Sequence, residues 1–254
     1  MKFLALIPAR YASSRFPGKP LTDILGKPMI QHVYERAAAI FEDCYVATDD
    51  ERIAQAVTKF GGRAVMTSDT HRSGTDRCRE ALDRVEKETG KTFDVTVNIQ
   101  GDEPFLDPEQ LRQLCACFLD ASTDIATLVK PFSKQENIFN PNSPKVVLST
   151  DGYALYFSRS VIPYLRGMEN PEKWQAKHRY FKHIGLYAYR SEVLRAITAL
   201  PPGMLEQAES LEQLRWLENG YRVKAAVTDK ENYAVDTPED LERICELYGR
   251  KTVR

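Results

Sequence analysis

The loop from Pro8 to Pro20 carries residue types that bind a polyphosphate. It holds three cations, Arg10, Arg15 and Lys19, with two serines and a glycine, and no carboxylate. Guanidinium groups make paired hydrogen bonds to phosphate oxygens, lysine adds a compact charge, and small residues allow close backbone approach. Neither a Walker A loop nor a Gly-x-Gly-x-x-Gly fingerprint is present, which disfavours an ordinary NTP hydrolase and a dinucleotide enzyme. A solvated basic loop is the alternative interpretation.

Two aspartates far apart in the chain are candidates for binding a divalent cation. Asp102 follows an apolar segment, and Asp236 directly precedes Thr237-Pro238, a helix-start pattern. Magnesium prefers oxygen ligands and keeps several waters, so one or two carboxylates suffice to hold it. Taken alone, each aspartate could equally fill a turn or solvate a loop.

The segment Ser73-Gly74-Thr75 is expected to open a helix. Free N–H groups at a helix start can bind an anion or the edge of a base. A plain N-cap explains the same pattern. Gln100-Gly101 stands beside Asp102 at the end of another apolar segment.

The elements that must position these residues alternate between strand and helix over the first hundred residues. Such repeats imply a parallel sheet with helices on both faces, with ligands beyond the carboxyl ends of the strands. The candidate residues follow expected strands at that edge. The expected strands are 3–7, 44–48, 64–67 and 94–99, and the expected helices start near 28, 49–51 and 73 and end, for the last two, near 61 and 90.

The second half is less regular. The expected strands are 125–129, 146–148, 154–157, 183–189 and 223–227, with one helix from about 205 to 220 and a last helix from 237. Residues 163–178 are polar and broken by prolines, which predicts an excursion that covers the site or meets a partner chain. We expect one domain over 1–254: a nucleotide-binding half (1–125), a mixed α/β portion (126–225) and a closing strand-loop-helix (226–254).

The composition excludes several classes of protein. A formal net charge of -1 argues against a nucleic-acid binder that works through its overall field. No apolar run approaches the ~18 residues of a membrane span, and the brief apolar start lacks a signal-peptide cleavage site. The five cysteines are odd in number and scattered without zinc-site spacing, so we expect reduced, structural thiols in a cytoplasmic protein.

These motifs together resemble the cytidylyltransferases that activate 3-deoxy-manno-octulosonate (KDO), a family of sugar-activating nucleotidyltransferases. The stretch from Arg10 to Lys19 resembles the nucleotidyltransferase signature of that family, and further agreement follows in family order over nearly the whole chain. The matching segments are 7–21, 26–30, 47–49, 73–77, 98–104, 153–159, 183–187, 211–215 and 235–240. Residues 160–180 match weakly.

The resemblance implies a Rossmann-like nucleotidyltransferase fold, a Mg²⁺ cofactor bound by Asp102 and Asp236, and a homodimer formed by residues 130–220. It implies catalytic roles for Arg10, Lys19, Asp102 and Asp236. The implied CTP-binding residues are Ala9, Arg10, Arg15, Lys19, Ser73, Gly74, Gln100, Gly101 and Asp102. The implied sugar-binding residues are Arg77, Gln100, Arg159, His183, Tyr187, Glu212 and Gln213. By themselves, His183 is typical of a core histidine, and Glu212 and Gln213 of a solvated helix face.

The reaction implied by the resemblance is attack of the anomeric hydroxyl of KDO on the α-phosphorus of CTP, giving CMP-KDO and pyrophosphate for lipopolysaccharide biosynthesis. Neither nucleic acid nor membrane is an expected partner. Other interpretations are a cytidylyltransferase for 8-amino-KDO or sialic acid, an enzyme that uses sugar 1-phosphates, and a non-catalytic nucleotide-binding protein. The second half lacks the dense cation cluster that a sugar-phosphate acceptor needs, and the intact Lys19, Asp102 and Asp236 speak against a non-catalytic role.

Overall fold

The computed structural model describes residues 1–12 and 16–252, with side chains through 249. The chain forms two compact units, one made of residues 1–112 and 232–254, the other of residues 113–231. The expectation of a single domain over 1–254 stays a prediction. Each unit is described by itself.

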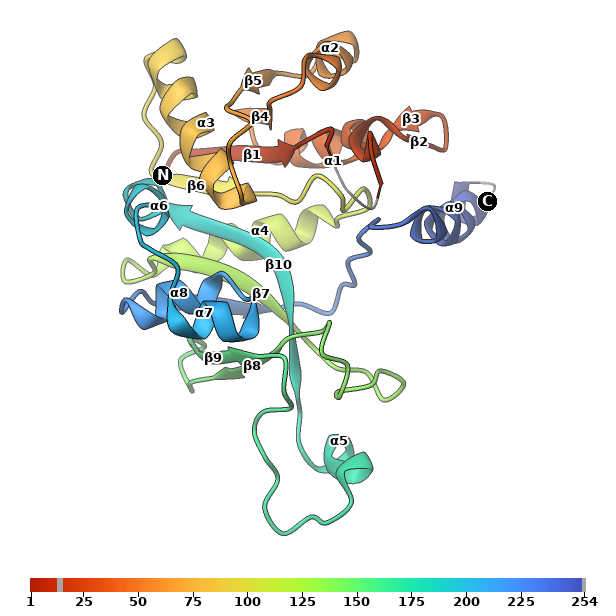
Figure 1. Cartoon of the computed structure of the whole chain (residues 1–254), viewed down its shortest axis with the longest axis vertical. Helices are drawn as coiled ribbons and strands as arrows, with labels where there is room; N and C mark the ends of the chain where they lie inside the picture. The colour runs from red at the N-terminus through yellow and green to blue at the C-terminus, as the bar shows by residue number, and fades with distance from the viewer. Residues whose placement is uncertain (13–15, 253–254) are drawn as a thin grey trace. The chain divides into compact units, whose positions relative to one another are not determined.

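The first unit contains a parallel sheet with the strand order β6-β1-β4-β5 (Figure 1). Its strands are β1 (Phe3–Ala9), β4 (Cys44–Thr48), β5 (Ala64–Met66) and β6 (Val95–Asn98). They are short apolar runs, and every residue of β4 and β6 is buried. Burial on both faces is the pattern of a parallel strand covered by helices. The four strands expected in this region are confirmed, with ends that differ by one or two residues.

Three helices connect these strands: α1 (Met29–Ala38), α2 (Glu51–Lys59) and α3 (Gly74–Thr89). The chain runs outward from β1 to β4 and β5, and α3 then returns it to β6 on the other side of β1. Because such crossovers are right-handed, α3 covers the opposite face of the sheet from α1 and α2. The direction in which successive strands are added to the sheet therefore reverses between β1 and β6. Open α/β sheets bind ligands at the carboxyl edge of such a switch point.

Local capping explains where α2 and α3 begin and where α3 ends. Asp50 accepts a hydrogen bond from the N–H of Arg52 (2.9 Å), and Ser73 Oγ accepts one from the N–H of Asp76 (3.1 Å). A side-chain oxygen there satisfies an N–H that has no partner within the helix. Helix α3 ends at Gly90, whose φ of 69° is left-handed and suits glycine.

The rest of the first unit packs around a small apolar cluster. This part of the unit comprises the 3-10 turn η1 (Lys19–Leu21), a two-stranded sheet of β2 (Asp23–Ile24) and β3 (Lys27–Pro28), the start of α4 (Pro108–Ala116) and the final helix α9 (Pro238–Thr252). Buried Ile24 and Met29 contact Val235 and Ile244, and Phe16 packs against the same cluster. This packing fixes the segment before α9, which carries Asp236, against the end of the basic loop, which carries Lys19.

The second unit is built on a mixed sheet. Its strands are β7 (Ile125–Pro131), β8 (Lys145–Leu148), β9 (Ala154–Ser158), β10 (Phe181–Arg190) and β11 (Val223–Val227). Strands β11 and β7 are parallel, while the pairs β7–β10, β10–β8 and β8–β9 are antiparallel. The pairing of β10 with β7 shifts register between Ile184 and Tyr187. All five expected strands are present, and β10 extends beyond its expected limits.

The single helix expected over 205–220 is wrong. The structure has two short helices, α7 (Met204–Glu209) and α8 (Gln213–Glu218), separated at Ser210 by a left-handed φ of 50°. The break turns Leu211 inward, where it is 7% exposed. Arg215 of α8 reaches back to Glu206 of α7 with two contacts of 2.6 and 2.7 Å, so the two helices fold onto each other. Helix α6 (Ser191–Thr198) was not expected, whereas the helical segment expected around Cys115 and Cys117 is present as α4 and the 3-10 turn η2 (Cys117–Leu119).

The excursion between β9 and β10 shares a small apolar core with the connection between β7 and β8. Its short helical turns are η3 (Pro171–Lys173) and α5 (Trp174–Lys177), which lie at its end in Figure 1. Trp174 and Tyr180 are buried with Ile138. Trp174 Nε1 donates to the carbonyl of Met168 at 3.0 Å, and Tyr180 Oη donates to that of Pro163 at 3.0 Å.

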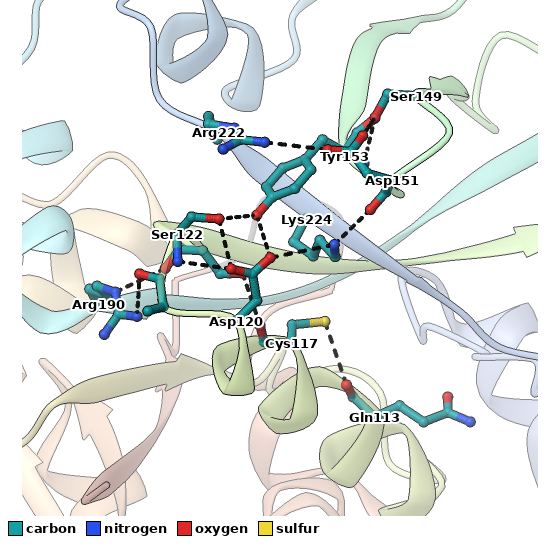
Figure 2. A network of polar contacts seen from close by, with 12 residues as sticks. Gln113, Cys117, Asp120, Ser122, Ser149, Asp151, Tyr153, Arg190, Arg222 and Lys224 are labelled. Atoms are coloured by element: carbon teal, nitrogen blue, oxygen red, sulfur yellow. Dashed lines mark hydrogen bonds and ion pairs between the residues drawn. The ribbon is translucent and has the colours of Figure 1, made fainter.

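A polar network fastens the turn before β9 to β11 and to the segment that precedes β7 (Figure 2). Tyr153 Oη donates to Asp120 at 3.0 Å and lies 2.9 Å from Ser122 Oγ, while Lys224 donates to the carbonyl of Asp151 at 2.6 Å. Hydrogen bonds from Ser122 and from Tyr153 lower the pKa of Asp120 to about 2. The groups satisfy one another, so we assign the network a structural role.

Within residues 1–12 and 16–252, no helix has both the length and the apolar character needed to cross a membrane.

Candidate functional site

A cavity of about 250 Å³ opens at the carboxyl edge of the first unit's sheet, at the switch point between β1 and β6. Its walls come from the loop after β1, the approach to α3, the loop after β6 and the segment before α9. The lining residues are Pro8, Ala9, Arg10, Lys19, Pro20, His71, Arg72, Ser73, Gly74, Arg77, Gln100, Gly101, Asp102 and Asp236. The expected CTP-binding residues that the structure describes therefore lie in one cavity, while Arg15 falls outside the described residues.

Lys19 joins the two candidate metal ligands. Its Nζ lies 2.7 Å from Asp102 Oδ2 and 3.2 Å from Asp236 Oδ1. The lysine side chain is 14% exposed, and those of the aspartates are 30% and 40% exposed. Two carboxylates separated by more than a hundred residues thus contact the same ammonium group, that of Lys19.

Backbone contacts hold the loops of the cavity together. A Cβ on Gly101 would lie 2.8 Å from the carbonyl oxygen of Pro8, closer than side chains approach a backbone atom, so the loops after β1 and β6 meet only because this residue is glycine. The N–H of Val235 donates to the carbonyl of Asp102 at 2.9 Å. That bond ties the segment carrying Asp236 to the loop carrying Asp102.

The basic loop closes on itself before it reaches Lys19. Gly18 has a left-handed φ of 72°, and its N–H donates to the carbonyl of Tyr11 at 3.0 Å. The guanidinium of Arg52 lies over the ring of Tyr11, 3.3 Å from its centroid. Arg10 lines the cavity and is exposed, as a residue that receives phosphate must be.

The start of α3 forms a second wall. Gly74 is the first residue of the helix, and a Cβ there would lie 3.3 Å from Cγ of Pro8, so the helix start lies close to the loop after β1. Gln100 lines the same cavity and donates to Asn98 Oδ1 at 3.4 Å. A helix N-terminus beside a cation cluster favours an anionic ligand.

Arg77, expected among the sugar contacts, lines the same cavity but is 3% exposed. Its Nη1 donates to Thr67 Oγ1 at 2.6 Å and lies 3.4 Å from Asp49 Oδ1. These contacts tie α3 to the ends of β4 and β5. A role for Arg77 in sugar binding stays a prediction.

Glu103 supports the loop that carries Asp102 and was not singled out from the sequence. It is 8% exposed, and burial, with the neighbouring Asp102 charge, raises the pKa of its carboxyl to about 8. Asn232 donates a hydrogen bond to it. In the sequence it reads as one more carboxylate beside Asp102, and only its burial distinguishes the two.

The second unit brings two expected sugar-binding residues, His183 and Tyr187, into an aromatic and polar cluster. The ring of His183 lies 5.2 Å from that of Tyr187, which contacts Trp216 edge to face at 5.0 Å, and burial lowers the pKa of His183 to about 4. Thr127 Oγ1 donates to the carbonyl of Leu186 (2.9 Å) and so accepts from His183 Nε2 (3.1 Å). Thr127 carries no signal in the sequence that would have revealed it.

Two buried polar groups on expected sugar-binding residues of the second unit lack hydrogen-bond partners among the described residues. They are Tyr187 Oη and Gln213 Nε2, on side chains that are 8% and 5% exposed. A buried polar group without a partner costs about 1–3 kcal/mol, so such groups commonly bind water or a ligand. Glu212 directly precedes α8 and is half-buried. The sugar contacts of all three stay predictions.

Arg159 has a different environment from the other expected sugar ligands. Its guanidinium donates to the carbonyls of Glu209 (2.6 Å), Pro141 (2.9 Å) and Ser210 (3.2 Å). These bonds use three of its five N–H donors to hold the link between α7 and α8. A contact of Arg159 with the sugar stays a prediction. Its hydrogen bonds show a structural role, because they hold neighbouring segments of the chain together.

The donor set of the cavity fits magnesium. Among the described residues, no three His, Cys, Asp or Glu side chains are gathered as a metal cluster. Two carboxylates are enough for Mg²⁺, which retains waters and takes phosphate oxygens as its other ligands. Asp102 and Asp236 already converge on one cation, the ammonium of Lys19, so they are the residues that would hold the metal.

Comparison with known proteins decides the family. The sequence matches the family model described as cytidylyltransferase over residues 4–248, nearly its full length.

The chain belongs to the cytidylyltransferase family.

Relatives with the same specific description are closely similar to this chain. A 3-deoxy-manno-octulosonate cytidylyltransferase of Bacteroides thetaiotaomicron is 60% identical and covers 99% of this chain and 100% of its own length. One of Parabacteroides distasonis is 59% identical over 96% of each chain. A solved structure of CMP:2-keto-3-deoxy-manno-octonic acid synthetase complexed with CTP is 45% identical, with a TM-score of 0.90 over 99% of this chain and 100% of that one. The predicted Rossmann-like nucleotidyltransferase fold and the family resemblance are confirmed.

Proposed function

We propose that this protein transfers the cytidylyl group of CTP to the anomeric hydroxyl of KDO, forming CMP-KDO and releasing pyrophosphate. The observation that carries the proposal is the convergence of Lys19, Asp102 and Asp236 in the cavity at the sheet's switch point. Relatives up to 60% identical over the full chain are named for this chemistry. Together they support an enzyme rather than a nucleotide-binding protein.

Different side chains of the cavity are proposed to contact different parts of CTP. Arg10 and Lys19 stabilise the β- and γ-phosphates and the negative charge that builds on the leaving pyrophosphate. The N-terminus of α3 and Gln100 form the part of the cavity left for the nucleoside. Positioning and charge neutralisation supply most of the rate enhancement in such transfers.

The bond changes are simple. The anomeric oxygen forms a bond to the α-phosphorus as the bond to the β-phosphate oxygen breaks, and the hydroxyl proton is lost to solvent or phosphate. Mg²⁺ held by Asp102 and Asp236 would neutralise phosphate charge and make the phosphorus more electrophilic. We therefore propose that the enzyme depends on Mg²⁺.

The KDO contacts implied by the resemblance are proposed for each unit by itself. Arg77 and Gln100 are in the first unit, and His183, Tyr187, Glu212 and Gln213 are in the second. Tyr187 Oη and Gln213 Nε2, which have no hydrogen-bond partner among the residues that the structure describes, support the proposal, because a sugar with many hydroxyls can satisfy a donor and an acceptor at once.

A homodimer formed through residues 130–220 and a cytoplasmic location in lipopolysaccharide biosynthesis complete the proposal, and both rest on the resemblance. Sedimentation of the purified protein at several concentrations tests the dimer. A single species of monomer mass at all concentrations would rule it out.

The metal assignment is tested with Asp102→Asn and Asp236→Asn, by measuring pyrophosphate release from CTP and KDO in saturating Mg²⁺. Asp83→Asn is the matched control, because Asp83 lies on α3 and pairs with Arg79 at the surface. We expect each cavity variant to lose at least a hundredfold in turnover, about 2.7 kcal/mol, and the control to keep wild-type rates. Near wild-type turnover in both cavity variants would show the assignment to be wrong.

A further inference from the structure

One histidine of the cavity has no role in the function proposed above. His71 lines the cavity, and its side chain is 19% exposed. Once the triphosphate lies on Arg10, Lys19 and the metal carboxylates, the base is left with the other lining residues. Among those are His71, Arg72, Ser73, Gly74, Arg77 and Gln100.

The ring of His71 is held by Glu80, two turns into α3. His71 Nε2 is hydrogen-bonded to Glu80 Oε2. The same carboxylate accepts the N–H of Ser68 at 2.9 Å and Nε of Arg84 at 2.7 Å. Glu80 therefore ties the loop after β5 to α3, and His71 is fixed at the end of that loop.

The charge state of Glu80 determines the polarity of the ring. Burial raises the pKa of the carboxyl, but the hydrogen bonds from Ser68, His71 and Arg84 outweigh it and lower the pKa to about 2. An ionised carboxylate only accepts hydrogen bonds, so His71 Nε2 must carry the proton. When the ring carries only this proton, Nδ1 is an acceptor.

A hydrogen-bond acceptor in this part of the cavity can distinguish cytosine from uracil. Cytosine presents an amino group where uracil presents an oxygen. The guanidinium groups of Arg72 and Arg77 only donate and would favour the oxygen of uracil. A site that prefers cytosine needs an acceptor against those donors.

We propose that His71, oriented by Glu80, selects cytosine by accepting a hydrogen bond from the amino group of the base at Nδ1. The inference rests on the proposed function in that CTP is the substrate. It makes His71 a specificity-determining residue and Glu80 a positioning residue. UTP is rejected because its oxygen and Nδ1 are both acceptors.

The test uses two amide replacements of His71. Each one retains only one of the two hydrogen-bonding positions of the ring, Nε2 or Nδ1. His71→Gln puts an amide near the position of Nε2, keeping the contact with Glu80 but offering nothing at Nδ1. His71→Asn puts an amide oxygen near the position of Nδ1 and loses the contact with Glu80. The measurement is kcat/KM for CTP and for UTP with KDO in Mg²⁺. We expect His71→Gln to lower the CTP:UTP ratio by about ten- to a hundredfold, as expected for one lost hydrogen bond at a buried group, and His71→Asn to retain more of it.

Glu80→Gln tests the positioning role, because a neutral amide no longer dictates which ring nitrogen carries the proton. Its CTP:UTP ratio should fall, mainly through the KM for CTP. Arg84→Gln is the control, since it removes another partner of Glu80 without changing the contact with His71. His178→Asn, which replaces a histidine of the second unit, should also leave the ratio unchanged.

An unchanged CTP:UTP ratio in His71→Gln would overturn the proposal. So would an equal loss for both nucleotides in His71→Gln, which is the result expected if the residue only stabilises the loop. Calorimetric titration of the wild type and variants with CTP and UTP separates this proposal from the proposed function. If the wild type forms no product, the proposed function fails, while the dissociation constants still decide the role of His71.

Discussion

Replacing Lys19 by methionine removes one charge from between two carboxylates and keeps nearly the same volume. Asp102 Oδ2 and Asp236 Oδ1 lie at 2.7 and 3.2 Å from Nζ, so they are at most about 6 Å apart. Without the ammonium they repel each other by about 0.7 kcal/mol in a water-like medium and about 3 kcal/mol at an effective dielectric constant of 20. Because the aspartates are 30% and 40% exposed, we expect a loss of stability near the lower end, about 1–2 kcal/mol.

The assay is thermal unfolding with and without Mg²⁺, together with turnover of CTP and KDO. A loss of this size lowers Tm by about 2–8 °C for a chain of this length. Mg²⁺ should raise the Tm of Lys19→Met more than that of the wild type, because the ion restores positive charge between the carboxylates. Turnover is a separate effect: kcat/KM should fall by about 30- to 1000-fold, equivalent to 2–4 kcal/mol of transition-state stabilisation.

Lys27→Met is the matched control, because Lys27 pairs with Glu35 at 2.7 Å but is 45% exposed and lies outside the cavity. It should change Tm and turnover little. A kcat/KM of Lys19→Met within tenfold of the wild type, or equal stabilisation of both proteins by Mg²⁺, would refute this role of Lys19.

Three further variants test separate parts of the structure. Gly101→Ala forces a Cβ against the carbonyl of Pro8 and should cost about 1–3 kcal/mol of stability and weaken CTP binding, as measured by denaturant unfolding and calorimetry; unchanged affinity would contradict the contact. His183 has a folded-state pKa of about 4, below its unfolded value, so the unfolded chain binds more protons and stability should fall as the pH falls from 6.5 to 4; His183→Gln should flatten that fall, and an unaltered pH profile would exclude it as the cause. Arg159→Lys keeps the charge but loses the three-carbonyl contact, so it should lower stability with KM for KDO unchanged; a raised KM with unchanged stability would favour a sugar contact.

The sequence predicts the first unit well because its signals are local. Apolar runs such as β1 and caps such as Ser73 report on a few neighbouring residues, and the alternation of strand and helix then places the basic loop and Asp102 at one edge. The contact of Lys19 with Asp236 needs tertiary structure, since 217 positions separate the two. In the sequence, only the family resemblance indicates that Lys19 and Asp236 belong to the same site.

The second unit shows why local patterns fail elsewhere. The apolar spacing around Leu205 and Leu214 is helical throughout, but Ser210 adopts a left-handed conformation because Arg215 pairs with Glu206 and folds α8 back onto α7. Thr127 became part of the His183 cluster only through the pairing of β10 with β7. Such contacts leave no periodic trace in the sequence.

The central claim is that this cavity joins CTP to KDO. The most direct measurement incubates the purified protein with Mg²⁺, CTP and, in separate reactions, KDO, 8-amino-KDO or sialic acid, and detects the CMP-sugar and pyrophosphate. We predict stoichiometric CMP-KDO and pyrophosphate, with KDO preferred and product lost in Lys19→Met. Binding of CTP without a CMP-sugar from any of the three acids would contradict it.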